Sequence, residues 1–386
     1  MRNNFLIFGA PLIEEAEINE VCDSMKIGWL GTGPKVKKFE KEFAVYKGVE
    51  NAAAVNSCTA ALHLSLVAID LRPGDEVITT PMTFCSTVNS IIHSGATPVL
   101  VDVDAVTMNI DPSALEEAIT SKTKAIIVVH FGGYPCEMDK ISEIAKKRNL
   151  FLIEDCAHAV ETIYKNRQAG TIGDFGCFSF YANKNIITGE GGMVLAKDNN
   201  MINRIKNLSL HGMSLDAWNR FGKDGYKHYE IVDCGFKYNM MDLQAAIGIH
   251  QLIKIDKMWD RRKKIWDQYT EELKNLPIKL PASIIDNSSK HAYHLYPIQI
   301  DINEAKLSRD QFLIEMGKLN IGVGVHYRSI PEYKYYQNRF KWIPEQWPNA
   351  LKIGQQTVSL PISPKMTDTD VDDVVSAIRS IFYNKY

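Results

Sequence analysis

Between about residues 50 and 200, the sequence alternates short runs of β-branched residues with stretches of helical spacing. The clearest of these runs cover residues 76–80, 97–102 and 124–129. Strands that alternate with helices predict βαβ units and a mainly parallel sheet covered on both faces. We therefore predict an α/β fold whose functional site lies at the carboxyl ends of the parallel strands.

The length of 386 residues allows one large domain and a smaller one. We expect the large domain to span residues 1–250. In the remainder, residues 251–386, a charged amphipathic helix over 251–276 leads into a small α+β domain. Its signals are a strand-like run over residues 293–300 and a helical pattern that starts with acidic residues over 369–378.

The composition is typical of a soluble globular protein, with 45% hydrophobic residues, 23% charged residues and a net charge of -2. This charge balance offers no basic surface for nucleic acid. No apolar run reaches the roughly 20 residues that span a bilayer, and the apolar stretch at the start is too short for a signal peptide. The seven scattered cysteines form no Cys-x-x-Cys pair, which indicates neither disulfides nor a metal site. We expect a cytoplasmic protein without membrane partners.

Two residues near the middle of the chain, Lys184 and Asp155, are candidates for a chemical role. Lys184 lies in a largely apolar stretch before Gly-Glu-Gly-Gly at residues 189–192, and an uncharged lysine amine can condense with an aldehyde. Asp155 follows the apolar run 150–153, where a parallel strand would open onto a site. An amine and a carboxylate are what pyridoxal 5′-phosphate (PLP) requires. Taken singly, the lysine also fits a solvated surface charge and the aspartate a helix cap.

A candidate phosphate site begins at Ser57, Cys58 and Thr59, where small polar residues run into a helical pattern. The start of a helix offers unpaired N–H groups and a positive dipole end, which suit a phosphate. The hydroxyl groups of Thr59 and Ser179 could each donate to the same phosphate. A helix with an ordinary N-terminal cap is the alternative.

Two rings complete the candidate site. Phe84 follows the strand that ends at Thr80, where it could stack on a flat heteroaromatic ring. His158 lies one helical turn after Asp155 and could reach the other side of that ring. The alternatives are a core phenylalanine and a structural histidine.

Three motifs together resemble those of the DegT/DnrJ/StrS sugar-nucleotide aminotransferases. They are Ser-Phe-x-x-x-Lys before the Gly-Glu-Gly-Gly turn, Glu-Asp-Cys-Ala-His-Ala at residues 154–159, and Gly-Phe-Lys-Tyr-Asn-Met at residues 235–240 followed by Gln-Ala-Ala. The similarity covers essentially the whole chain. It implies fold type I of the PLP enzymes, a homodimer, and transfer of an amino group from glutamate to a keto sugar linked to a nucleoside diphosphate. Pyridoxamine 5′-phosphate would form between the two half-reactions.

The resemblance also implies a role for each candidate residue. Lys184 resembles the lysine that binds the cofactor aldehyde, and Asp155 the carboxylate that keeps the pyridine nitrogen protonated. Phe84 matches the stacking aromatic residue, and His158 lies where the family has a residue near the ring hydroxyl. The phosphate cradle comprises Ser57, Cys58, Thr59 and Ser179.

Two further cofactor-binding candidates, Lys237 and Asn239, concern the dimer. The family often has Asn at the first position and Arg at the second, and this chain differs at both. On a strand, both side chains project from one face, so either could reach the phosphate of the partner subunit. The resemblance thus implies active sites shared between two chains.

Five residues are implied to bind the substrate: Trp29, Thr32, His326, Tyr327 and Arg328. The segment over residues 211–229 resembles the family's variable loop near the sugar nucleotide. It contains Trp218, Arg220, Phe221, Lys223 and Tyr226. Aromatic rings and cations suit a nucleobase and a diphosphate, and a polar loop without a ligand is the alternative.

The presence of Lys184, where a histidine marks the dehydratases of the family, favours amination. The sequence around Trp29, Phe84 and His326 is most similar to family members that aminate UDP-4-keto-L-arabinose, which favours C4 of a UDP-linked sugar and a role in lipopolysaccharide or other polysaccharide biosynthesis. Amination at C3 and of dTDP- or GDP-linked 4-keto-6-deoxyhexoses stay open. A non-catalytic PLP-binding regulatory protein would not need both Lys184 and Asp155. A nucleotide-binding oxidoreductase lacks support because no Gly-x-Gly-x-x-Gly follows the first strand.

Overall fold

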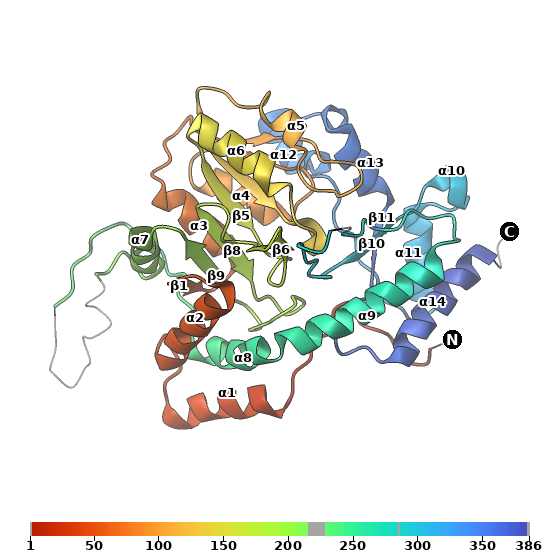
Figure 1. The fold of residues 1–386 in the computed structure, drawn as a ribbon, viewed down its shortest axis with the longest axis horizontal. Helices are drawn as coiled ribbons and strands as arrows, with labels where there is room; N and C mark the ends of the chain where they lie inside the picture. Colours follow the sequence, from red (N-terminus) through yellow and green to blue (C-terminus); the bar gives the residue numbers. More distant parts are fainter. Residues whose placement is uncertain (1, 215–227, 285, 384–386) are drawn as a thin grey trace.

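A seven-stranded sheet forms the centre of the protein in a computed structural model that describes residues 2–214, 228–284 and 286–383 (Figure 1). The strand order is β1-β9-β8-β5-β4-β2-β3. Neighbouring strands are parallel from β8 to β3, whereas β9 runs antiparallel to both β1 and β8. The strands are β1 (Ala52–Val55), β2 (Glu76–Thr79), β3 (Thr97–Leu100), β4 (Thr123–Val129), β5 (Phe151–Asp155), β8 (Phe175–Ser179) and β9 (Gly192–Ala196).

Helices cover both faces of this sheet (Figure 1). Side chains of a strand alternate between faces, so Ala53 and Val55 pack in one hydrophobic cluster with α3 and α7, while Ala52 and Ala54 pack in another with α2 and α8. The predicted α/β fold with a mainly parallel sheet is confirmed. The helices around the sheet are α1 (Glu15–Ile27), α2 (Pro34–Lys47), α3 (Cys58–Ala68), α4 (Cys85–His93), α5 (Pro112–Leu115), α6 (Met138–Arg148), α7 (Asn199–Ser209) and α8 (Asp242–Ile253).

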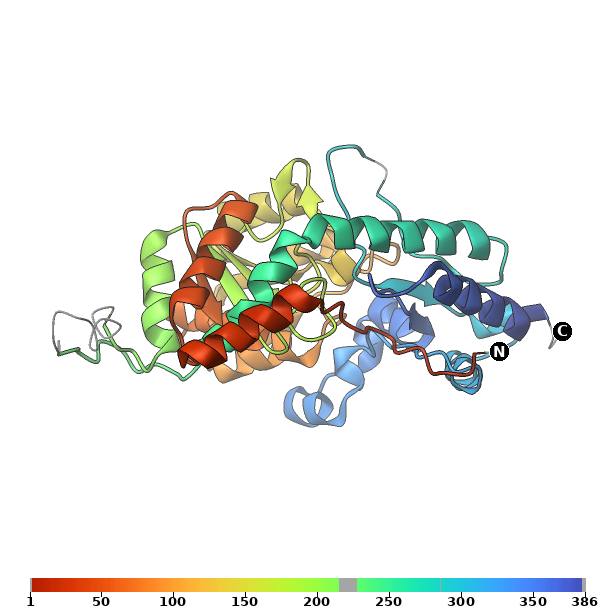
Figure 2. The same ribbon diagram turned by 90° about the horizontal axis from the view of Figure 1, so that it is seen from below.

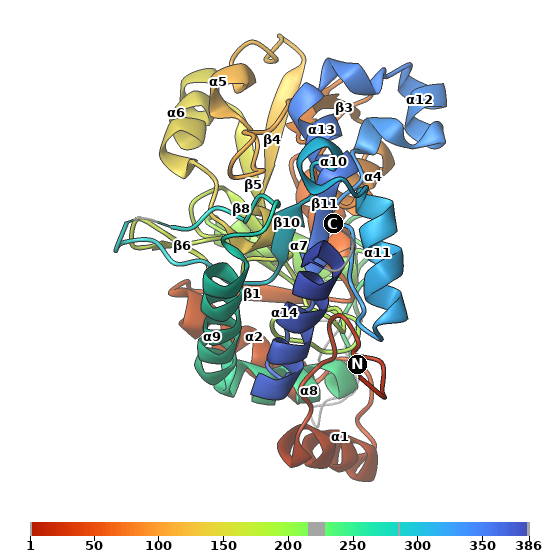
Figure 3. The ribbon, with the colours of Figure 1, turned by 90° about the vertical axis from the view of Figure 1, so that its right-hand side faces the viewer.

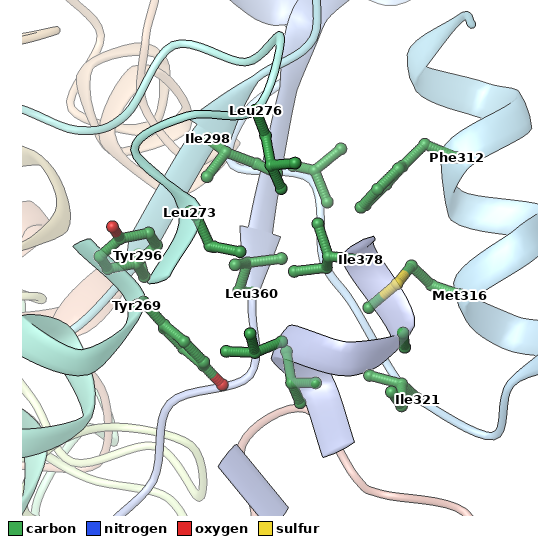
Figure 4. Close-up of a cluster of buried hydrophobic side chains, with 14 of the residues drawn as sticks. Tyr269, Leu273, Leu276, Tyr296, Ile298, Phe312, Met316, Ile321, Leu360 and Ile378 are labelled. Atoms are coloured by element: carbon green, nitrogen blue, oxygen red, sulfur yellow. The ribbon is translucent and has the colours of Figure 1, made fainter. Parts of the chain in front are cut away.

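The C-terminal part has its own core. Helix α9 (Ile255–Leu273) leads away from the sheet, and β10 (Tyr296–Gln299) pairs antiparallel with β11 (Thr357–Leu360) (Figure 3). Side chains from α9, the two strands, α11 (Arg309–Lys318) and α14 (Asp368–Tyr383) meet in a hydrophobic cluster, part of which is drawn in Figure 4. The helix predicted over residues 251–276 is interrupted, since α8 ends at Ile253 and α9 begins at Ile255. The remaining helices are α10 (Ile302–Ala305), α12 (Lys334–Phe340) and α13 (Pro348–Gln356).

The first residues of the chain lie against the C-terminal part, so both ends of the described chain are on the same side (Figure 2). Leu6 forms a parallel bridge with Ile321, and Arg2 Nη1 lies 2.6 Å from an Asp370 carboxylate oxygen. The division between residues 1–250 and 251–386 stays a prediction. In the part of the chain that the structure describes, every helix is too short or too polar to span a bilayer.

Four parallel strands position the candidate site. Strands β2, β4, β5 and β8 end at Thr79, Val129, Asp155 and Ser179. Because these strands are parallel, their carboxyl ends meet at one edge of the sheet. Residues far apart in the sequence are thereby gathered at that edge.

Candidate active site

A cavity of about 570 Å³ lies at this edge of the sheet. Its walls come from the starts of α3 and α4, the ends of β5 and β8, the turn before β9 and the segment 325–333. Ten predicted site residues line it: Ser57, Cys58, Thr59, Phe84, Asp155, His158, Ser179, Lys184, His326 and Tyr327. The structure thus brings most of the sequence-derived candidates into one place.

Asp155 lies at the buried end of β5 and is only 4% exposed. Its carboxylate accepts hydrogen bonds from the Thr87 hydroxyl at 2.8 Å and from the Ala157 N–H at 3.1 Å. Burial raises the pKa of this carboxyl, while the hydrogen bond from Thr87 lowers it. An anion held in this way is suited to pair with a cationic group that enters the cavity.

Lys184 is half-buried, and its side chain faces the same cavity. Burial lowers the pKa of its amine to about 8, although the nearby Cys58 and Asp155 groups act in the opposite direction. Among the described residues, none forms a hydrogen bond or ion pair with its Nζ atom. The amine is therefore available to react with a molecule in the cavity.

The start of α3 forms the second wall. The Ser57 hydroxyl accepts from the Ala60 N–H at 3.1 Å and caps the helix. The N–H groups of Cys58 and Thr59 have no partner within the helix, because they belong to its first turn. Gly192 of β9 approaches so closely that a Cβ atom there would lie 2.5 Å from the Ser57 carbonyl. The result is a narrow anion site made of backbone donors.

The Cys58 side chain points away from the anion site that its backbone helps to form. Its thiol lies 3.9 Å from an Asp155 carboxylate oxygen and 3.6 Å from the Cys177 carbonyl oxygen. Cys58 therefore faces the floor of the cavity, and only its backbone faces the predicted phosphate position.

His158 and Tyr327 form a hydrogen-bonded pair in the third wall. The Gly132 N–H donates to His158 Nδ1 at 3.2 Å, so this nitrogen carries no proton. Burial, with the charges of Lys184 and His326, lowers the pKa of His158 well below its ordinary value. The neutral ring is therefore protonated on Nε2, which donates to the Tyr327 hydroxyl oxygen at 3.0 Å. Burial raises the pKa of Tyr327, so this hydroxyl keeps its own proton for another acceptor.

The aromatic residues of the cavity differ in exposure. Phe84 is 57% exposed, and its ring centre lies 6.1 Å from that of Tyr327. An exposed ring at a cavity wall is available for stacking on a ligand. His326 instead stacks on Phe8 at 5.4 Å and bonds through Nδ1 to the Ser359 hydroxyl at 2.9 Å, and burial lowers its pKa to about 3.

Five predicted site residues lie outside the cavity of this single chain. Asn239 Nδ2 donates to the Thr32 hydroxyl at 2.6 Å, and Trp29 Nε1 donates to the Thr32 carbonyl at 3.1 Å. Lys237 is exposed nearby. Arg328 is exposed and lies over the Tyr333 ring, 5.1 Å from its centre. The predicted loop residues Trp218, Arg220, Phe221, Lys223 and Tyr226 lie outside the described residues.

Some residues that hold the site together were not indicated by the sequence. The Thr87 hydroxyl donates to Asp155, and the hydroxyl of Thr83, four residues earlier and just before α4, lies 2.7 Å from the Thr87 hydroxyl. The four-residue spacing between Thr83 and Thr87 was the sequence signal that could have indicated this contact. Asn185, next to Lys184, donates to the Glu161 carboxylate at 2.9 and 3.0 Å. No local pattern in the sequence indicates that contact.

PLP fits the residues that are present. The N–H groups of Cys58 and Thr59, which have no partner within their helix, and the close approach of Gly192 provide an anion cradle. Asp155 provides a buried carboxylate, and Lys184 provides a free amine in the same cavity. Phosphate, ring nitrogen and aldehyde each find a matching partner.

The fold and the cavity together define a PLP-dependent enzyme of fold type I. The sequence of residues 11–379 matches the DegT/DnrJ/EryC1/StrS aminotransferase family, and the chain belongs to that family. It is 49% identical to the spore coat polysaccharide biosynthesis protein SpsC of Bacillus subtilis over 381 residues, and this alignment covers 98% of each chain. It is 50% identical to protein MJ1066 of Methanocaldococcus jannaschii over 99% of this chain and 98% of that protein.

Solved structures of similar proteins are also aminotransferases. Spr1654 of Streptococcus pneumoniae, named as a sugar aminotransferase, is solved in PLP and PMP forms. Both forms match with a TM-score of 0.91 and 33% identity. The match covers 98% of this chain, 99% of the PLP form and 98% of the PMP form. PseC of Helicobacter pylori, an aminotransferase involved in the biosynthesis of pseudoaminic acid, matches with a TM-score of 0.91 and 27% identity over 99% of this chain and 100% of that one. The predicted family, fold, enzyme class and cofactor are confirmed.

Proposed function

We propose that this aminotransferase moves the amino group of glutamate to a keto carbon, C4, of a sugar linked to UDP. The observation that carries the proposal is the meeting of Lys184, Asp155 and the anion cradle of α3 in one cavity. The similarity to SpsC supports a sugar destined for a polysaccharide, and PseC and Spr1654 support a sugar substrate. A role in lipopolysaccharide synthesis and a cytoplasmic location stay predictions.

Lys184 and Asp155 have complementary roles in this proposal. When bound, PLP supplies an aldehyde that accepts amino groups and a ring that withdraws electrons from the reacting carbon. Lys184 would hold PLP through its amine and would move a proton to and from the reacting carbon. A pKa of about 8 leaves part of the amine uncharged near neutral pH, as a base requires. Asp155 would stabilise a proton on the ring nitrogen.

The other cavity residues bind and orient. The N–H groups of Cys58 and Thr59, with the hydroxyls of Thr59 and Ser179, would hold the phosphate, and Phe84 would stack on the ring. Ser57 acts through its cap on α3.

The hydrogen-bonded pair His158 and Tyr327 has a separate role in this proposal, which is to donate a proton to the substrate. His158 holds the oxygen of the Tyr327 hydroxyl, so that the tyrosine proton is directed to an acceptor, which we propose is the keto oxygen of the sugar. His158 is thus a positioning residue rather than a direct partner of the substrate, and Tyr327 is a substrate-contacting residue, as is His326 beside it.

The proposal is tested by incubating the purified enzyme with glutamate and a panel of UDP-, dTDP- and GDP-linked keto sugars, with products identified by mass and by the position of the new amine. Lys184→Ala serves as the control without turnover. We expect an amino sugar at C4 of a UDP-linked substrate. An amine at C3, or on a dTDP- or GDP-linked hexose, would correct the substrate but keep the class. Conversion of glutamate without amination of any sugar nucleotide would contradict the proposed function.

A homodimer with shared active sites is part of the proposal. Lys237 and Asn239 lie outside the cavity of their own chain, and Trp29 next to them is 53% exposed. In a C2 dimer such a surface is presented reciprocally to the partner. Mixing a Lys184→Ala chain with a chain altered at both Lys237 and Asn239 should restore part of the activity, because one of the two mixed sites receives all wild-type groups. An absence of rescue in proven mixed dimers would contradict shared sites.

A further inference from the structure

A small cavity of about 180 Å³, the junction cavity, lies between the sheet-containing part of the chain and the C-terminal part. Its walls come from the loop after β3, the segment before β10, β10 itself, α10 and α13. Among the described residues, none lines both this cavity and the active-site cavity. Liquid water occupies about 30 Å³ per molecule, so the cavity has the volume of about six waters and suits a small ligand rather than a nucleotide. Its polar lining includes Lys279, Gln299, Asp301, Glu304, Asn349 and Lys352.

Hydrogen bonds hold the walls of the junction cavity together. Lys279 and Gln299 form an antiparallel bridge, in which the N–H of each donates to the carbonyl oxygen of the other at 2.9 Å. The Lys279 ammonium donates to the Ala105 carbonyl at 2.7 Å, and the Asn349 side chain donates to the Val103 carbonyl at 2.8 Å. The loop after β3 is thereby tied to the segment before β10 and to α13. A molecule in the cavity would contact both parts of the chain.

Gln299 brings a buried donor without an acceptor to this cavity. Tyr296 and Ile298 of β10 lie in the hydrophobic cluster of the C-terminal part, so the side chain of Gln299 projects from the opposite face of the strand, toward the cavity. Gln299 is only 4% exposed, and in the part of the chain that the structure describes its Nε2 atom has no hydrogen-bond partner. A buried N–H without an acceptor destabilises a fold. An oxygen atom of a bound ligand would satisfy it.

Charged side chains of both signs line the junction cavity without pairing with one another. Lys279 and Lys352 carry the positive charges, and Asp301 and Glu304 carry the negative ones. Over residues 2–214, 228–284 and 286–383, none of the four forms an ion pair, and neither Lys352 nor Glu304 forms a hydrogen bond through its side chain. The charge of Lys279 also acts on the nearby Asp104 carboxylate, so Lys352 is the more available cation. A ligand that carries both charges would pair with both sets.

From this arrangement we infer that the junction cavity binds a free α-amino acid, which is a small zwitterion. Gln299 Nε2 and the two lysines bind its carboxylate, whereas Asp301 and Glu304 bind its ammonium group. The bound amino acid links the loop after β3 to the C-terminal part and is not consumed, because the site is separate from Lys184. The inference goes beyond the proposed function and does not depend on it.

The test uses PLP-loaded enzyme that has been reduced with borohydride, which fixes the cofactor on Lys184. This enzyme no longer reacts with amino acids, so calorimetry with each standard amino acid measures binding alone. We expect at least one of them to bind. The keto acid and the amine that each lack one of its two charges should bind about 10-fold or more weakly, on the scale of a lost hydrogen bond to a charged group. If no amino acid binds at millimolar concentration, or if both analogues bind equally well, the inference is wrong.

Variants assign the binding to this cavity. Gln299→Leu, which keeps the size of the side chain but removes the buried donor, should weaken the affinity by about 10-fold or more. Lys352→Ala and Glu304→Gln change exposed side chains, whose charges solvent screens, and should each weaken it by about 3-fold. Lys257→Ala removes an exposed lysine of α9 as the matched control and should bind as the wild type does.

The two exposed variants keep the test decisive even if Gln299→Leu does not fold. If an amino acid binds the reduced enzyme but Lys352→Ala and Glu304→Gln both retain the wild-type affinity, it binds elsewhere and the inference is wrong. Either result leaves the proposed function unaffected, because these residues lie outside the active-site cavity.

Discussion

Replacing Lys184 by methionine should stabilise the protein while it abolishes activity. The two side chains have similar length, but methionine places no charge in the cavity. Burial lowers the pKa of Lys184 from 10.5 to about 8, which corresponds to about 3 kcal/mol at 1.36 kcal/mol for each pKa unit. Water in the cavity screens part of this effect because the side chain is only half-buried. We expect a gain of about 1–3 kcal/mol at pH 7.

The pH dependence separates this charge effect from a packing effect. A lysine with a lowered pKa in the folded state destabilises that state fully at every pH below about 8. The destabilisation fades from about pH 8, where the folded state loses the proton, to about pH 10.5, where the unfolded chain loses it as well. The advantage of the methionine variant should therefore shrink over the same interval. An advantage that came only from the apolar side chain would not change.

The assay is urea unfolding of the PLP-free proteins, followed by circular dichroism at pH 7, 9 and 10.5. Wild type, Lys184→Met and Lys257→Met are compared, because Lys257 is an exposed lysine of α9 that provides the matched control. The control should differ from the wild type by less than about 0.5 kcal/mol, as surface changes usually do. Equal stability of wild type and Lys184→Met at pH 7, or a gain that persists at pH 10.5, would refute the reasoning.

Three further variants follow from the same geometry. Asp155→Asn should keep PLP, seen by its absorbance, but lose turnover by at least about 100-fold, because a neutral amide does not stabilise a protonated ring nitrogen; near-normal turnover would make Asp155 a structural residue. Tyr327→Phe should lower kcat by about 10-fold or more with little change in the affinity for free UDP, and an unchanged kcat would contradict proton donation. Glu154→Gln should cost about 2–4 kcal/mol in urea unfolding at pH 7, because the buried carboxylate accepts from three backbone N–H groups and pairs with His130. Since these bonds lower the pKa of Glu154, its stabilisation is present above about pH 4.5 and lost as the pH falls through the lowered pKa, so the variant should show less acid sensitivity than the wild type.

Much of the fold was predictable because it depends on local patterns. The β-branched runs predict strands close to those found, with β2 at Glu76–Thr79 and β4 at Thr123–Val129. Parallel strands end at one edge, which is why the position of Asp155 after an apolar run is enough to place it at a site. The joint presence of Lys184 and Asp155 in motifs of one family then indicates the cofactor.

The contacts between distant segments were not predictable in this way. Tyr327 bonds to His158 across 169 positions of sequence, and no periodicity indicates that pairing. The side chain of Cys58 turns toward Asp155 because successive residues of a helix point about 100° apart, so Cys58 and Thr59 do not face the same group. In the proposed homodimer, the positions of Lys237 and Asn239 relative to a cavity would depend on a second chain, whose placement the single sequence does not contain.

The position of the reactive lysine depends on its neighbour rather than on contacts of its own. Asn185 donates to the Glu161 carboxylate and to the Ala292 carbonyl at 2.8 Å, so its amide oxygen is left to accept from His294 Nδ1 at 2.9 Å. Of these bonds, the one to Glu161 involves a carboxylate, and a hydrogen bond to a charged group contributes about 1.5–3 kcal/mol. The backbone next to Lys184 is thereby fixed to the segment that leads into β10. The Lys184 amine can lack a partner among the residues that the structure describes because the adjacent Asn185, and not the amine, holds the loop.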